Sequence, residues 1–178
     1  MPRNENNVRA YGDLSNAVYV APLGTVMPTG FEAPATPWAE LGWLGEDGVS
    51  VSSDISSETY RAFQGATIVR KLITENTTTF VVTALESNEV VRSLRFRGAE
   101  TVKAGGTATT VVKNQTANDE RAFVLDFVDG DKKLRYLLPK ASHELTGEVT
   151  YSATGITSYE FTLTPVGEWT VIETADAP

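Results

Sequence analysis

The chain has 178 residues, a formal net charge of −8 and no cysteine, and 41% of its residues are hydrophobic. These values are typical of one globular domain. They exclude disulfides and cysteine-based zinc sites, and the acidity disfavours tight nucleic-acid binding, which needs clustered Lys and Arg. No apolar run reaches the length of a membrane helix, so we expect no membrane insertion by this chain.

The first fourteen residues are polar and lack hydrophobic periodicity, which predicts a flexible N-terminal arm over 1–14. They also lack the apolar core of a secretory signal, so we do not expect export. The remainder, 15–178, is predicted to form a single β-sandwich domain. Its first two strands are expected at 17–22 and 38–44, where β-branched and aromatic residues dominate.

A long polar segment follows at 45–65, which we predict to be a protruding hairpin loop with a short strand at 49–53. Its apolar residues have the spacing of an extended hairpin but no evident core within the monomer. We therefore assign this loop to contacts between subunits, made by Val49, Val51, Ile55, Tyr60, Arg61 and Phe63. Two ordinary strands are predicted next, at 67–74 and 77–85.

One helix is predicted at about 87–96. Ser87 or Glu86 is expected to cap its start, basic residues crowd its last turn, and Gly98 ends it. An apolar stripe along one side should pack on the sheet. It consists of Val90, Val91 and Leu94.

Turn signals divide the rest of the chain into hairpins. Gly105-Gly106, Asp129-Gly130 and Thr154-Gly155 are each flanked by extended, Val- and Thr-rich or alternating segments. Strands are expected at 101–102, 109–112, 123–128, 134–138, 149–151, from 156 onward and at 168–174. One helix among many strands predicts a mainly β fold, a β-sandwich or half-open barrel with the helix on its flank.

The residue chemistry predicts no catalytic, metal or cofactor site. His143, the one histidine, lies beside Glu144, where we expect a partly exposed structural residue. Paired acids lie in predicted turns without calcium-loop spacing, and glycine-rich phosphate loops are missing. Trp38 and Trp43 would suit a non-catalytic carbohydrate-binding module, but packing in a core or an interface is the favoured interpretation.

Two segments resemble the major tail tube proteins of long-tailed, siphovirus-like bacteriophages. Residues 17–25 are similar to the family's A-x-V-x-V-A-P-x-G-T segment, whose last eight positions match residues 18–25, and residues 38–49 to its W-x-x-L-G-[WY]-[LIV]-x-E-D-G-[VI] segment. Residues 80–91 resemble its strand-into-helix step, and 141–165 its last hairpin. The stretch 98–118 matches no shared motif, which leaves the strand register there open.

The resemblance implies a β-sandwich subunit that forms hexameric rings. The rings would stack into a hollow tube around a tape-measure protein, bounded by tail terminator and tail-tip proteins. DNA would later pass through the lumen without specific binding. The chain would be made in the cytoplasm of a host bacterium and reside in the virion tail. A tail terminator or a capsid decoration protein is the rival interpretation among viral structural proteins.

A conduit for DNA favours an acidic wall, because a wall of Lys and Arg would bind many phosphates. We therefore expect acids on the lumen-facing sheet, at solvent-side positions of the hairpins. The candidates are Asp126, Glu148 and Glu160.

Overall fold

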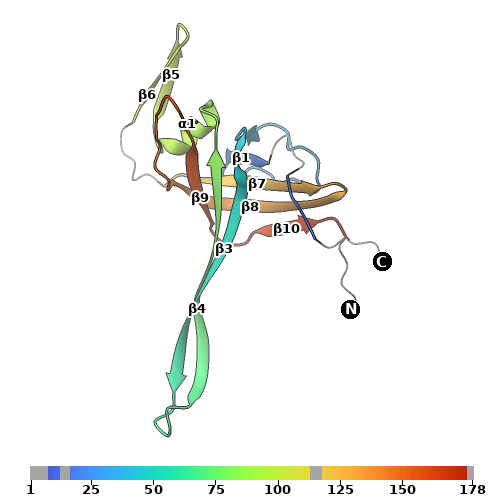
Figure 1. The fold of residues 1–178 in the computed structure, drawn as a ribbon, viewed down its shortest axis with the longest axis vertical. Helices are drawn as coiled ribbons and strands as arrows, with labels where there is room; N and C mark the ends of the chain where they lie inside the picture. The colour runs from blue at the N-terminus through green and yellow to red at the C-terminus, as the bar shows by residue number, and fades with distance from the viewer. Residues whose placement is uncertain (1–7, 13–16, 113–117, 176–178) are drawn as a thin grey trace.

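The computed structural model describes residues 8–12, 17–112 and 118–175, and these ranges contain ten strands and one helix (Figure 1). The elements are β1 (Val18–Pro22), β2 (Ala39–Glu40), β3 (Leu44–Arg61), β4 (Ile68–Ala84), α1 (Glu89–Arg95), β5 (Glu100–Ala104), β6 (Thr107–Val111), β7 (Glu120–Asp129), β8 (Lys132–Leu145), β9 (Tyr159–Pro165) and β10 (Thr170–Glu173). The predicted mainly β fold with one helix is confirmed.

Eight strands form one open antiparallel sheet with the order β2-β1-β7-β8-β9-β4-β3, and β10 pairs with β8. The sheet turns along β8, because residues 134–137 of this strand pair with β10 and residues 141–145 pair with β9. Figure 1 shows the result: β7, β8 and β10 cross the direction of β4 and β9. The sheet therefore curls around a core without closing into a barrel.

The main core lies inside this curl. It is built from alternate residues of several strands, among them Phe80, Phe123, Phe161 and Leu163, all of which are buried. The period-two alternation of β7 and β9 predicted from the sequence is what places these side chains on one face. On the other face of β7 and β8, Tyr19, Val124 and Leu137 form a smaller cluster.

Helix α1 closes the open side of the main core with Val91 and Leu94, both buried. Its predicted position is confirmed, but the predicted cap is wrong. Asn88 is the N-cap, and its side-chain oxygen accepts a hydrogen bond of 2.9 Å from the Val91 amide. The same Asn88 side chain donates to the Leu41 carbonyl, so the cap also ties the helix to the preceding chain.

Two of the three predicted hairpin turns are confirmed. Strands β5 and β6 meet at Gly105-Gly106, and β7 and β8 meet at Gly130-Asp131. A strand at 149–151 is not formed: residues 146–158 make a connection without strand pairing, and β8 pairs directly with β9. Of the predicted N-terminal arm, 1–7 and 13–14 lie outside the described residues, whereas Ala10 and Gly12 donate backbone hydrogen bonds to the end of β7.

Candidate assembly interface

The hairpin of β3 and β4 projects far from the rest of the molecule (Figure 1). Its strands pair from Leu44 opposite Ala84 to Arg61 opposite Ile68. Phe80 is fully buried opposite Val51, but none of the residues 52–79 is buried. The hairpin thus leaves the body after Val51 and reaches roughly 33 Å further to Arg61 at 3.3 Å per strand residue. We call residues 52–79 the arm.

The prediction of a protruding hairpin is confirmed, but its loop over 45–65 is wrong: residues up to Arg61 belong to the long strand β3, and only 62–67 connect it to β4. Polar side chains join the two strands where no core supports them. Ser52 and Thr79 share a hydrogen bond of 2.7 Å, and Ser53 donates to Asn76 at 3.1 Å. Such cross-strand pairs stabilise a sheet without burial, so a Ser- and Thr-rich sequence that indicates a loop also suits an exposed ribbon.

The proposed contact residues are distributed along the whole hairpin. Val49 packs against the main core, so the expectation that it lacks an intrachain partner is wrong. Val51 lies half-exposed at the root, Ile55 is 56% exposed midway, and Phe63 is fully exposed at the turn. An aromatic ring left in water at the end of a stiff ribbon is an apolar surface that a partner can cover.

Two polar members of the set have partners within the arm. The Tyr60 hydroxyl donates to the Glu58 carboxylate at 2.7 Å, which raises the pKa of Tyr60. The Arg61 guanidinium donates to the Ala66 carbonyl at 3.1 Å and braces the turn. Arg61 therefore stabilises the turn at the end of the arm and also gives that end a positive charge.

Sequence reasoning missed the apolar residues of the returning strand. Ile68, Val69 and Ile73 are all more than half exposed. The sequence predicts a strand at 67–74, and β-branched residues in strands usually pack on at least one face. Only the pairing with β3, which the structure shows, places these residues on the arm, and no local signal in the sequence distinguishes them from a buried strand.

The three candidate lumen acids occupy different environments. Asp126 is only 8% exposed, so the expectation that it faces solvent is wrong. Its carboxylate accepts two hydrogen bonds from Arg135, at 2.5 and 2.6 Å, and Arg135 also donates to the carbonyls of Gly30 and Glu32. Asp126 therefore neutralises a buried arginine and ties the segment before β2 to the sheet.

Glu160 lies on the outward face of the β8–β9–β4 region, because its neighbours Tyr159 and Phe161 point into the core. This face is polar and rich in Ser and Thr, and its cations lie at the edges: Lys140, which precedes Ala141 on β8 and pairs with Glu120 at 2.8 Å, and Arg97, 3.8 Å from Glu144. By register it comprises Val81, Thr83, Ser142, Glu144, Glu160, Thr162 and Thr164. Glu148 is exposed in the connection that follows β8.

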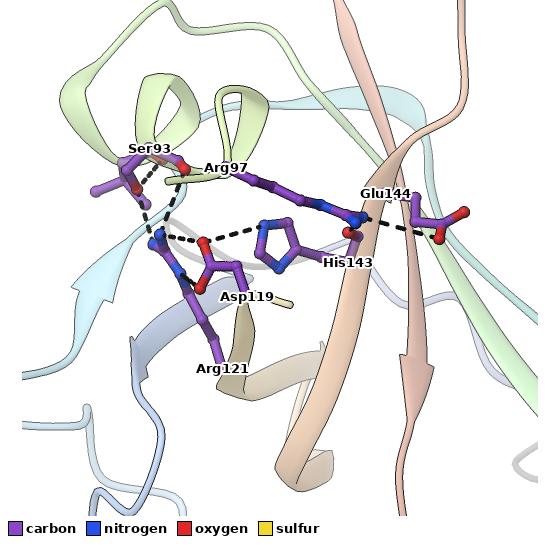
Figure 2. A network of polar contacts seen from close by, with 7 residues as sticks. Ser93, Arg97, Asp119, Arg121, His143 and Glu144 are labelled. Carbon is purple, nitrogen blue, oxygen red and sulfur yellow. Dashed lines mark hydrogen bonds and ion pairs between the residues drawn. The ribbon is translucent and has the colours of Figure 1, made fainter. Parts of the chain in front are cut away.

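A second polar cluster lies between α1 and the ends of β7 and β8 (Figure 2). Arg121 donates to both Asp119 oxygens and to the hydroxyl and carbonyl oxygens of Ser93 in the helix. Burial raises the pKa of Asp119, but the hydrogen bonds and charge of Arg121 outweigh it, so this pKa lies below its usual range. Arg97 donates to the carbonyl of His143 and lies 3.8 Å from Glu144.

His143 is fully buried beside this cluster, so the expectation of partial exposure is wrong. Its Nε2 lies 3.8 Å from Asp119, and neither ring nitrogen has a partner of normal hydrogen-bond geometry among the described residues. Burial lowers the pKa of His143 to about 4, against the attraction of Asp119 and with the repulsion of Arg121 and Arg97. The ring packs edge-on against Phe123 and is a neutral part of the core at pH 7.

The described residues contain no group of three or more His, Asp or Glu that could hold a metal ion. They also contain no helix long and apolar enough to cross a membrane. The most conspicuous surface feature is instead an arm with exposed apolar groups on a β-sandwich body, which is typical of a subunit in a protein assembly.

Comparison with known proteins identifies that assembly. The family model described as "Phage tail tube protein" matches residues 1–171. The chain therefore belongs to the phage tail tube protein family, and it is a structural tail tube subunit whose place is the virion tail. Such a subunit assembles with copies of itself and with other virion components.

A search of curated protein sequences returns no match. Among solved structures, the chain is similar to a chain of the virion of a native gene transfer agent particle, with a TM-score of 0.45 and 12% identity. The similarity covers 93% of this chain and all of that chain.

Proposed function

We propose that this chain forms hexameric rings that stack into the tail tube through which the genome is delivered. The observation that carries the proposal is the arm, a stiff two-stranded ribbon. Its apolar side chains stay exposed to water as long as the chain is a monomer, and a neighbouring subunit could cover them. Ring closure would also cover the open sheet edges at β2 and β3, which in a monomer are free to pair with other chains. In this arrangement the arm contacts neighbouring rings.

The polar outward face that carries Glu144 and Glu160 is our proposed lumen wall, with Glu148 close to it. The paired positions of this face carry mainly hydroxyls and carboxylates, and the two cations at its edges, Lys140 and Arg97, lie beside Glu120 and Glu144, so the face offers few sites at which DNA phosphates would be held. The lumen would first hold a tape-measure protein, and tail terminator and tail-tip proteins would bound the tube. No catalytic step is part of this function.

Removing the arm tests the proposal. We would replace residues 54–77 with Asn-Gly, which joins Ser53 to Thr78, a pair in the native register, by a two-residue hairpin turn. The main core stays whole, so the variant should fold, with a circular dichroism spectrum still of the β type and cooperative thermal unfolding. We expect the parent chain to form rings and stacked tubes in negative-stain micrographs at high concentration, and the variant to form no tubes.

The rival interpretation is a carbohydrate-binding module, favoured by Trp43, which is 70% exposed, whereas Trp38 packs against the small cluster. That interpretation predicts a parent chain that stays monomeric at high concentration and is missing from purified particles. Normal tubes from the armless variant would show that the arm does not connect rings.

A further inference from the structure

The outer end of the arm, residues 59–74, combines an apolar tip with positive charge. It contains Arg61, Arg70 and Lys71. The nearest acids, Glu58 and Glu75, flank it on the two strands, and Glu58 accepts a hydrogen bond from the Tyr60 hydroxyl. Phe63 is fully exposed at its turn, and Ile68 and Val69 follow on the returning strand, both more than half exposed. The part of the arm beyond these two acids therefore combines exposed apolar side chains with three cations.

A pocket of about 560 Å³ lies at the other end of the same hairpin. Its volume falls within the usual range of about 300–1,000 Å³ for binding pockets. Apolar and aromatic side chains line it between the root of β3 and strands β7 and β8. They include Trp43, Leu44, Val49, Phe127 and Tyr136.

The rim of this root pocket is acidic. Glu46 and Asp47 line it and are exposed, and Gly45 alone separates them from Trp43 and Leu44 in the chain. Asp126 also lines the pocket, but its charge is compensated by Arg135. The root pocket is therefore complementary to the outer end of the arm. It offers an apolar recess that can take an aromatic ring, and carboxylates beside the recess that can pair with Arg and Lys.

We propose that the outer end of one copy's arm, led by Phe63, occupies the root pocket of another copy. The two surfaces cannot meet within one chain, since the paired strands of the arm hold them roughly 33 Å apart. The contact joins two different patches, so it is heterologous, and a stack built from it has free arms at one end and free pockets at the other. This inference rests on the proposed tube, and it identifies the root pocket as the surface to which the arm binds.

Fit and charge favour this occupant. Insertion would remove the Phe63 ring from water against Trp43 and Tyr136, and an aromatic anchor in a pocket is the usual centre of an interface. Glu46 and Asp47 would face Arg70 and Lys71, and such complementarity guides association and selects the partner. The one other projecting hairpin in the described ranges, β5–β6, carries no aromatic residue at its turn.

Disulfide trapping tests the contact. The chain has no cysteine of its own, so every disulfide formed must involve the introduced residues. We would combine Gln64→Cys at the turn with Glu46→Cys at the rim, both exposed positions. Under mild oxidation of assembled protein, we expect a ladder of covalent multimers in this double variant and none in the pair Thr107→Cys with Glu46→Cys. A ladder from the Thr107 pair would assign the pocket to the β5–β6 hairpin and overturn the proposal.

Charge exchange gives a second readout. Arg70→Glu with Lys71→Glu should abolish tubes, as should Glu46→Lys with Asp47→Lys, and the four changes together should restore them. Phe63→Ser should leave the melting temperature of the monomer unchanged and prevent tubes. If the parent forms tubes and all of these variants do too, with no ladder, the pocket assignment fails and the tube stands. If the parent itself forms neither rings nor tubes, the proposed function fails.

Discussion

At the scale of single residues, two buried ionisable side chains on β8 differ in their charge state. Arg135 has a side-chain exposure of 1% and keeps its charge, because Asp126 faces it with both carboxylate oxygens. His143 has no such partner among the described residues and is kept neutral by burial. The sequence shows which residues can carry charge, whereas burial and partners decide which of them do.

His143 should make the stability of the monomer depend on pH. Its pKa is about 4 in the folded chain and ordinarily 6.5. Between these values the unfolded chain binds a proton that the folded chain does not, so the free energy of unfolding falls as the pH drops through this window. The full difference amounts to roughly 3 kcal/mol at its lower end.

Urea denaturation of dilute monomer at several pH values from 7 to 4 measures this dependence, with His143→Gln as the matched variant. The variant lacks the titrating ring, so its stability should change less with pH, whatever its absolute stability. The pKa of Asp119 lies below its usual 3.8, so this group loses its stabilising contribution only at lower pH. Equal slopes for parent and variant would contradict the assignment.

At the scale of elements, α1 shows how a short helix is fixed from both sides. Asn88 caps its start, Glu89 lies in its first turn, and basic residues lie in its last, which suits the helix dipole. Seven residues are too few for a stable isolated helix. Its stability therefore comes from Val91 and Leu94, which it buries against the sheet.

Leu94→Asp should place an unpaired charge in the main core and cost roughly 3–5 kcal/mol, enough to unfold a domain of ordinary stability. Arg92→Ala on the same helix removes a side chain that is not buried, and we expect a change within about 0.5 kcal/mol. Thermal denaturation of the two variants, compared with the parent, measures the difference. Similar melting temperatures would show that the helix does not seal the core.

At the scale of the whole molecule, the curled sheet separates a polar outward face from the projecting arm. The outward face of β8, β9 and β4 is our proposed lumen wall, and this placement follows from the register of three strands that are distant in sequence. The arm points away from the body (Figure 1). Wall and stacking contact can therefore be changed separately.

Glu160→Lys should leave tube formation intact and slow genome ejection. The change places a cation where DNA passes, and each such contact adds affinity for phosphate. Salt screens charges over about 10 Å at 0.1 M, so the effect requires a position on the wall. Asp131→Lys, at the exposed turn between β7 and β8, makes the same charge change away from the proposed wall.

The measurement is the rate of DNA release from particles assembled with each variant. We expect slower release with Glu160→Lys and normal release with Asp131→Lys. Equal rates for the two variants would place Glu160 outside the lumen.

The sequence by itself determined the fold class, the position of the helix, and the β5–β6 and β7–β8 hairpins. These features are local: period-two alternation, capping residues and glycine turns act over a few neighbouring residues. The order of the family's segments was likewise readable from the chain, and the family match agrees with it.

Only the tertiary structure decided the rest, because pairing between distant segments is not written in local periodicity. The polar run 45–65 became a strand through its pairing with β4, and Asp126 and His143 became buried through contacts with Arg135 and Phe123. The strand 149–151 did not form, because β8 pairs with β9 instead. Burial and partner choice depend on which strands meet, and that is settled only when the sheet curls around its core.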